Sequence, residues 1–182
     1  MKYFKKLESD RIYLSPASVD DVEIYTRWMN SFDVTDKIGS SNSLFSLLSE
    51  KEYLERKIDE NNKSFSIIKK EDDSLLGNCS IFDINYLHQT ATLGIFIGED
   101  NERNKGYGSE AIRLLLDFGF NYLNLNNIML KVFSFNEKAI SCYEKIGFKK
   151  IGRKREAYYL NNQRYDEIYM DILKEEYFKT KF

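Results

Sequence analysis

The sequence contains little proline and cysteine and has no long apolar runs. Proline occurs once, at Pro16, and the two cysteines are Cys79 and Cys142. Two cysteines are too few for a disulfide framework or a zinc site, and no run approaches the roughly 18 apolar residues of a membrane-spanning helix. The opening residues MKYFKKLESDR also lack the apolar stretch of a secretory signal. We therefore expect a cytoplasmic protein without a metal site or a membrane segment.

An excess of charge of either sign is absent as well. The formal net charge is −2, which gives no overall reason to expect nucleic acid or an acidic membrane as a partner. What the chain has in quantity is aromatic residues, 13 tyrosines and 13 phenylalanines, which suit strands and packed helices. Its 182 residues, 42% of them apolar, predict one domain over 1–182.

The hydrophobic pattern alternates between strand and helix periods along the chain. It predicts the element order β-α-α-β-β-β-α-β-α-β-β, which favours an α+β fold with a mixed sheet. The polar segment 31–43 reads as an irregular loop, and the helix after it is expected to start after Ser49. The expected strands lie in 11–18, 64–86 (a hairpin), 90–97, 128–134 and 148–173 (two strands), and the expected helices in 18–30, 40–61, 107–120 and 136–147.

A glycine turn marks the change from strand to helix within IFIGEDNERNKGYGSEAIRLLLDFGF, residues 95–120. A helix N-terminus carries unpaired N–H groups and a partial positive charge, so it can hold phosphate. Gly106 and Gly108 would let main chain approach such a ligand closely. Arg103 and Lys105 add positive charge just before the turn. The segment therefore predicts a ligand that carries phosphate.

Three other interpretations of the glycine turn are a dinucleotide-binding loop, a nucleoside-triphosphate P-loop and a turn with a purely structural role. GYGSEA matches the dinucleotide pattern G-x-G-x-x-A, which requires an acid at the end of the next strand to hold the ribose. This sequence has Ser134 and Asn136 at the end of that strand. A nucleoside-triphosphate P-loop would need Lys-Ser or Lys-Thr after the glycine, and this sequence does not have either pair there. A turn that merely starts a helix is the purely structural alternative.

Two motifs, RNKGYG and NEKAISCYEKIGF, together resemble the GNAT superfamily of N-acetyltransferases. RNKGYG, residues 103–108, is similar to its diphosphate-binding turn, and NEKAISCYEKIGF, residues 136–148, is similar to its Asn-x-x-Ala-x-x-x-Tyr-x-x-x-Gly-Phe segment. The resemblance extends over residues 11–173 and implies the GNAT acyl-CoA N-acyltransferase fold, with a mixed, mostly antiparallel sheet flanked by helices. The ending, GRKREAYYLNNQRYDEIYMDIL, resembles the branch with ribosomal-protein N-terminal acetyltransferases and spermidine/spermine acetyltransferases.

The resemblance implies that acetyl-CoA donates its acetyl group directly to an amine. Tyr143 matches the general acid of the family, although helix spacing also allows it to be a packed aromatic residue. A phenol near pKa 10 protonates a thiolate near 8.5 only at a cost, unless the site lowers the phenol's pKa. Asn136 is expected to cap a helix and to contact the cofactor. The implied cofactor-binding residues are Phe96, Ile97, Arg103, Asn104, Lys105, Gly106, Tyr107, Gly108, Ser109 and Asn136.

The general base is not evident from the sequence. Many relatives carry a glutamate on the strand before the turn, where this chain has Thr92. Asp83, Tyr86 and Glu156 are the alternatives, and Glu156 would equally suit a structural salt bridge. Without an obvious carboxylate the site suits an amine of low pKa, because freeing a lysine-like amine at pH 7 costs roughly 4–5 kcal/mol and an α-amine about 1–1.5 kcal/mol.

The acceptor stays open between a protein N-terminus, a polyamine and another small amine. A polyamine would favour a cluster of acids, and the loop 31–43 supplies only Asp33 and Asp36. A catalytically silent acyl-CoA-binding sensor is an alternative of a different class, and a homodimer and a monomer are equally compatible with the aromatic C-terminal strands. Four groups are expected to be structural: His88 in a solvated turn, Cys142 as a small buried residue, Trp28 in the core, and the basic run 149–155 as a solvated face.

Overall fold

A mixed eight-stranded sheet forms the centre of the computed structural model, which describes residues 2–59 and 63–180. The strand order is β1-β2-β3-β4-β5-β6-β8-β7. Among the described strands, only the neighbours β5 and β6 are parallel, and the other neighbours are antiparallel. The expected α+β class with a mixed, mostly antiparallel sheet is confirmed.

The strands and helices follow one another with short connections. The strands are β1 (Leu7–Glu8), β2 (Ile12–Pro16), β3 (Lys63–Lys69), β4 (Leu75–Asn85), β5 (Thr90–Ile97), β6 (Asn127–Phe133), β7 (Lys149–Leu160) and β8 (Gln163–Leu173). The α-helices are α1 (Val22–Met29), α2 (Phe32–Ile38), α3 (Leu47–Asp59), α4 (Tyr107–Asn121), α5 (Glu137–Ile146) and α6 (Lys174–Thr180). Single 3-10 turns, η1 (Val19–Asp21) and η2 (Asp100–Glu102), precede α1 and the glycine turn.

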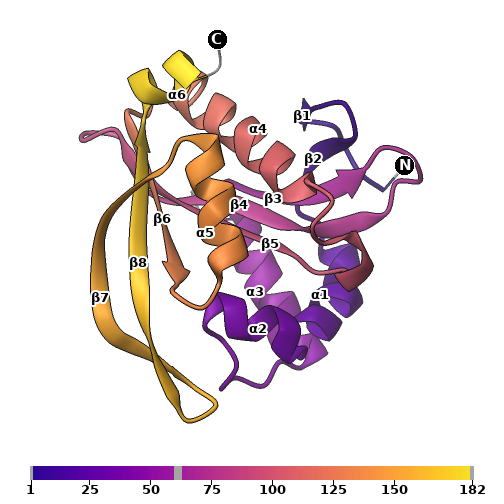
Figure 1. The fold of residues 1–182 in the computed structure, drawn as a ribbon. Coiled ribbons are helices and arrows are strands. Elements are labelled where there is room, and N and C mark those ends of the chain that lie inside the picture. The colour runs from indigo at the N-terminus through magenta and orange to yellow at the C-terminus, as the bar shows by residue number, and fades with distance from the viewer. Residues whose placement is uncertain (1, 60–62, 181–182) are drawn as a thin grey trace.

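Helices cover both faces of the sheet. Helices α4, α5 and α6 lie on one side, and α1, α2 and α3 lie on the other (Figure 1). Strand β5 divides its side chains between the two: Ile95 and Ile97 pack into the core under α4, whereas Phe96 packs with the core of α1 to α3. This alternation is the period of two that a strand imposes on a sheet with two buried faces.

The strands β5 and β6 separate after a short parallel contact. Their register runs from Thr90–Asn127 to Thr92–Met129, yet β5 continues to Ile97 and β6 to Phe133. Figure 1 shows the two strands diverging beyond that point. Because α4 follows β5 and α5 follows β6, both helices begin on the side of the sheet where the strands part.

The segment 31–43 is not the irregular loop that its polarity predicted. It contains α2, whose Val34 and Thr35 are buried, and the helix ends at Gly39 with a left-handed φ of 80°. Glycine adopts that conformation without steric cost, so it is a normal helix terminator. The buried residues of this short helix gain their stability from tertiary packing, which a window of polar residues does not reveal.

Helix α3 starts at Leu47, slightly earlier than predicted. Ser46 and Ser49 exchange hydrogen bonds in which each hydroxyl accepts from the other residue's N–H, at 2.9 and 3.1 Å. Reciprocal bonds of this kind satisfy the free donors of a helix start. The last part of the predicted 40–61 segment, residues 60 and 61, lies outside the described residues.

Candidate functional site

The glycine turn presents unpaired main-chain donors at the start of α4. Gly106 is the N-cap, with φ 90°, and among the described residues no side-chain hydrogen bond caps the helix. Glu110 makes the first helical bond by donating its N–H to the Gly106 carbonyl at 3.1 Å. The N–H groups of Tyr107, Gly108 and Ser109 therefore have no partner within the helix. This arrangement suits a phosphate or another anion.

The residue Asn104 gives the turn a second left-handed position, with φ 61°. Asparagine tolerates this conformation better than other residues with a side chain. Turns in which left-handed residues alternate with others make concave surfaces lined by N–H groups. Both Asn104 and Gly106 thus shape the backbone, which is a role independent of any ligand.

The two cations before the turn are engaged by the protein itself. Arg103 donates through Nε to the Ile97 carbonyl at 2.9 Å and through Nη2 to the Gly98 carbonyl at 3.0 Å, and it pairs with Asp100. Lys105 pairs with Glu102 at 2.9 Å. Direct contact of Arg103 or Lys105 with a ligand remains a prediction, and it requires these pairs to open or to be shared.

Main-chain groups of β5 face the gap between β5 and β6. The Gly98 N–H donates to the Leu76 carbonyl at 2.8 Å, so by strand alternation Phe96 is hydrogen-bonded to its β4 partner Asn78. The N–H and C=O groups of Ile95 and Ile97 consequently point away from β4, toward the gap.

Main-chain contact of Phe96 with a ligand stays a prediction, and strand alternation argues against it because it directs those groups toward β4. The Phe96 ring instead packs edge-on against Trp28, with centroids 5.9 Å apart. Ile95 was not predicted as a site residue. Strand period alone would have placed Ile95 and Ile97 on the same side, because residues two apart share an orientation.

The second motif describes a capped helix. Asn136 is confirmed as the N-cap of α5, since its side chain accepts from the Ala139 N–H at 3.3 Å. Gly147 ends the helix with φ 117°, and Phe148 is buried in the core. Asn136, Gly147 and Phe148 thus have structural reasons, and Tyr143 is the motif position whose chemistry they leave open.

Helix α5 contacts the first turn of α4 beside Tyr143. The Ser109 hydroxyl lies 3.1 Å from the Cys142 sulfur, and Tyr143 packs on Phe148 with ring centroids 5.9 Å apart. Cys142 is half-buried and not a fully buried residue as expected. Within the described residues the Tyr143 hydroxyl has no hydrogen-bond partner, so it is available to a ligand.

The environment of Tyr143 raises the pKa of its phenol well above the usual 10. Burial is the main cause, because it disfavours the charged phenolate, and nearby Cys142 adds to the shift. The free site therefore does not lower the phenol's pKa, as an easy proton transfer to the thiolate would require. Tyr143 is a neutral hydrogen-bond donor over the physiological pH range.

The candidates for a general base lie on different parts of the sheet. Asp83 is exposed at an irregularity of β4, with φ 51°, and Tyr86 is 51% exposed in the following turn. Glu156 is exposed on β7 with φ 49°, and its N–H donates to Asp166 at 2.8 Å. Among the described residues its carboxylate has no ion pair, so the salt-bridge alternative finds no support. Thr92 lies on β5 between Phe82 and Met129.

Other predicted structural residues behave as expected. Trp28 is 3% exposed, and a Cβ on Gly98 would lie 2.1 Å from its ring, so it is a core residue. His88 is exposed in the β4–β5 turn. The basic run 149–155 lies on the exposed edge strand β7, where Lys150 pairs with Glu144 at 2.9 Å.

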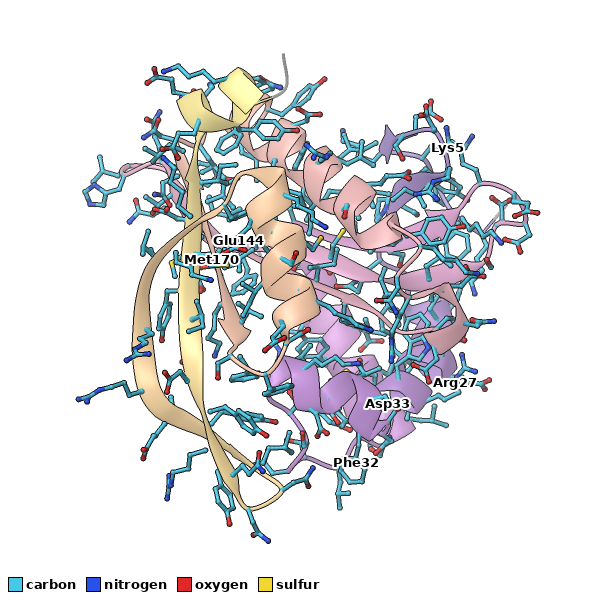
Figure 2. All side chains as sticks on the ribbon, viewed as in Figure 1. Lys5, Arg27, Phe32, Asp33, Glu144 and Met170 are labelled. Atoms are coloured by element: carbon cyan, nitrogen blue, oxygen red, sulfur yellow. The ribbon has the colours of Figure 1, made fainter. Side chains whose placement is uncertain are left out.

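Two acids of the α2 region, Asp33 and Asp36, bear on whether the acceptor is a polyamine. Asp33 is exposed on α2, and Asp36 accepts a hydrogen bond from Ser41 at 2.6 Å. Ser41 also lies 3.1 Å from the Tyr158 hydroxyl, which connects the end of α2 with β7. Figure 2 shows Phe32 and Arg27 at the periphery of the α1–α2 layer. The two acids therefore differ in their surroundings, since Asp33 is exposed and Asp36 is engaged by Ser41.

A cavity of about 710 Å³ lies on the other side of α5 from the glycine turn. Helix α5 contributes Ile140 and Glu144 to it, whereas Cys142 of the same helix lies against Ser109 of α4. Lys150 and Arg153 of β7 form the opposite wall. This cavity is separate from the gap between β5 and β6.

The described part of the chain offers neither a membrane-spanning helix nor a metal site. Within residues 2–59 and 63–180, no helix combines the length and the apolar character needed to cross a bilayer. In the same ranges, no group of three or more histidine, cysteine, aspartate or glutamate side chains could hold a metal ion.

Comparison with known proteins gives a consistent result. A family model described as an acetyltransferase (GNAT) domain matches residues 14–169. The chain is 29% identical over 180 residues to the uncharacterized N-acetyltransferase p20 of Bacillus licheniformis, covering 94% of this chain and 97% of that one. It is 31% identical over 126 residues to the spermidine N(1)-acetyltransferase of Vibrio cholerae serotype O1, covering 69% of this chain and 72% of that one.

A solved structure has the same fold. The spermidine N-acetyltransferase from Vibrio cholerae in complex with CoA and spermine superimposes with a TM-score of 0.84 at 26% sequence identity, covering 92% of this chain and 98% of that chain.

Proposed function

This chain belongs to the GNAT family of acetyltransferases, and from that premise we propose how its residues share the work of acetyl transfer. It is an N-acetyltransferase that uses acetyl-CoA as acetyl donor. The observation that carries the assignment of roles is the set of three free N–H groups at Tyr107, Gly108 and Ser109, beside the gap between β5 and β6. These donors suit the diphosphate of CoA, and the gap suits its pantetheine arm.

The main chain of β5 supports the rest of the cofactor. Ile95 directs its N–H and C=O groups into the gap, and Ile97 directs its N–H there. An extended arm can pair with these groups as a further strand would. One of these N–H groups is suited to the thioester oxygen, which gains negative charge during attack. Arg103 keeps the end of β5 in place by holding the Ile97 carbonyl.

The transfer itself is direct. The neutral amine attacks the thioester carbonyl carbon, a C–N bond forms, and the C–S bond then breaks to release the CoA thiolate. Tyr143 donates a hydrogen bond or its proton to the departing sulfur, and the proton from the amine leaves to water or a base. Burial raises the pKa of the phenol, and it also raises the pKa of a thiol whose thiolate forms nearby. Because both pKa values move in the same direction, burial by itself does not increase the difference between them.

The acceptor that we propose is a small primary amine, with polyamines as the first class to test. A similar protein of Vibrio cholerae is named a spermidine acetyltransferase, and a similar structure from that organism was solved with CoA and spermine. A protein N-terminus is the second class, and the lack of a buried carboxylate opposite the gap, among the described residues, favours it through its lower pKa.

An amine panel distinguishes these classes. Release of CoA thiol is measured with spermidine, spermine, simple monoamines and a short peptide with a free α-amine and no lysine. We expect turnover with at least one small amine. If acetyl-CoA binds by calorimetry and no amine is acetylated, the chain is an acyl-CoA-binding sensor and the catalytic proposal fails.

The pH dependence tests for a general base. Without a base on the enzyme, kcat/KM for a polyamine rises about tenfold per pH unit up to the amine pKa near 10. A plateau well below pH 9 would show that a protein group removes the proton. Glu156→Gln and Asp83→Asn then identify which candidate supplies it.

A further inference from the structure

Arg11 spans a long sequence distance to reach the glycine turn. It lies between β1 and β2, and its guanidinium contacts residues that follow it by about a hundred positions. Its Nη1 donates to the Lys105 carbonyl at 3.0 Å, and its Nε donates to Glu110 at 2.5 Å. The same group lies over the Tyr107 ring, 4.8 Å from the centroid. One side chain therefore touches the turn before α4, its first residue and its first helical turn.

The bond to Lys105 determines where a neighbouring donor points. The Lys105 carbonyl and the Gly106 N–H belong to one planar trans peptide, in which the two groups point in opposite directions. When Arg11 holds that carbonyl, the Gly106 N–H faces away from Arg11. Without this bond the peptide could rotate and turn a carbonyl oxygen, which repels anions, toward the ligand.

Gly106 is adapted to this contact as well as to its left-handed φ. A Cβ at Gly106 would lie 3.0 Å from the Arg11 Nη2 atom, tighter than a normal contact. The absence of a side chain thus allows the guanidinium to approach the turn.

The pair with Glu110 removes an unfavourable charge. Glu110 is the acid in the first turn of α4, close to the free N–H groups. Unpaired, it would repel a diphosphate or compete with it for those donors. Arg11 and the Ser9 hydroxyl, which donates to Glu110 at 2.8 Å, hold the carboxylate in place.

We propose that Arg11 is a positioning residue for acetyl-CoA: it orients the diphosphate-binding turn and neutralises Glu110 without touching the acetyl group. This inference rests on the proposed function of the turn. It adds a residue from the N-terminal part of the chain to the cofactor site, outside both motifs that suggested the family.

The test compares a ligand that carries the diphosphate with one that does not. Dissociation constants of CoA and of S-acetylpantetheine are measured by calorimetry for the wild type, Arg11→Gln and Arg11→Lys. We expect Arg11→Gln to weaken CoA about tenfold, the loss of a charge-assisted bond, and to leave S-acetylpantetheine within about twofold. Arg11→Lys should recover part of the loss, because an ammonium pairs with Glu110 but lacks the fork that also reaches Lys105.

Arg27→Gln is the matched control. Arg27 is also exposed and also pairs with a glutamate, Glu99, shortly before the glycine turn, but among the described residues no contact connects it with residues 105–110. Its variant should bind both ligands as the wild type does.

An equal loss of both ligands in Arg11→Gln, or the same loss in Arg27→Gln, would overturn the inference. If Arg11→Gln does not fold, the CoA-specific loss in Arg11→Lys decides the question. A wild type that binds CoA no more tightly than S-acetylpantetheine would instead contradict the diphosphate role of the turn itself.

Discussion

At the scale of single residues, Tyr143 is the position whose catalytic role has to be distinguished from a packing role. Its motif neighbours Asn136, Gly147 and Phe148 all have structural roles, so the motif alone does not establish a proton donor. Its hydroxyl, without a partner among the described residues, and its position beside the α4–α5 contact support the catalytic proposal.

Tyr143→Phe should slow the chemical step and leave cofactor binding intact. We expect kcat to fall about a hundredfold or more, the usual contribution of a general acid, while the dissociation constant of acetyl-CoA stays within about twofold. The raised pKa keeps Tyr143 protonated through pH 10, so the wild-type rate should show no decline from its ionisation below that pH. Equal kcat in the variant would leave Tyr143 a packing residue.

Alanine substitutions at Gly106 and Gly152 test the role of the glycine turn, with Gly152 as the control. Gly106→Ala must place a side chain at φ 90° and against Arg11, so we expect a loss of about 1–2 kcal/mol in stability and a clear loss of CoA affinity. Gly152→Ala on β7 meets nothing within 4 Å and should change neither. Urea unfolding and calorimetry of both variants measure this difference; equal behaviour would contradict it.

At the scale of secondary-structure elements, the separation of β5 from β6 is the feature that we propose as the cofactor site. Parallel pairing ends at Thr92–Met129, so within the described part of the chain the rest of β5 has one edge without a neighbouring strand. An unpaired edge is usually a risk for aggregation. Here both helix starts lie beside it, and we propose that the pantetheine arm occupies it.

Hydrogen exchange of β5 tests this proposal. The amides of Ile95 and Ile97 face the gap, whereas that of Phe96 is bonded to β4, so the first two should exchange faster in the free protein. Acetyl-CoA should slow exchange at Ile95 or Ile97 and leave Phe96 unchanged. The measurement is residue-resolved NMR exchange with and without acetyl-CoA. Protection at Phe96 alone would contradict the deduced strand orientation.

At the scale of the whole molecule, buried tyrosines predict sensitivity to alkali. Burial raises the pKa of Tyr25 above its usual 10, and the same cause raises the pKa values of Tyr3, Tyr13 and Tyr177. Above pH 10 these tyrosines ionise in the unfolded chain but stay protonated in the folded one. The unfolded state then binds fewer protons, so stability is full below pH 10 and falls as the pH rises.

Tyr25→Phe gives this prediction a specific readout. Tyr25 lies 3.1 Å from Ser66 and accepts from Asn78, so the variant should lose about 1 kcal/mol at pH 7. Above pH 10 it lacks one ionising group, and its stability should fall less steeply, by up to about 1.4 kcal/mol per pH unit. Urea midpoints at pH 7, 10 and 11 measure both effects. Parallel pH profiles of the two proteins would contradict the prediction.

Local patterns in the sequence were sufficient for most of the elements and for the two motifs. The glycine turn, the Asn136 cap and the Gly147 stop all act within a few neighbouring residues, so composition and spacing report them. Helix α2 was missed because its few apolar residues are stabilised by contacts made elsewhere in the chain.

The sequence by itself determined that a strand enters a helix through bare backbone suited to phosphate, because dihedral freedom and helix-end donors are local properties. Only the tertiary structure decided which β5 peptides face the gap, that Arg103 and Lys105 are already paired, and that Arg11 holds the turn from about a hundred residues away. Strand partners, ion pairs and burial depend on which distant segments meet, and residue spacing along one chain does not encode that directly.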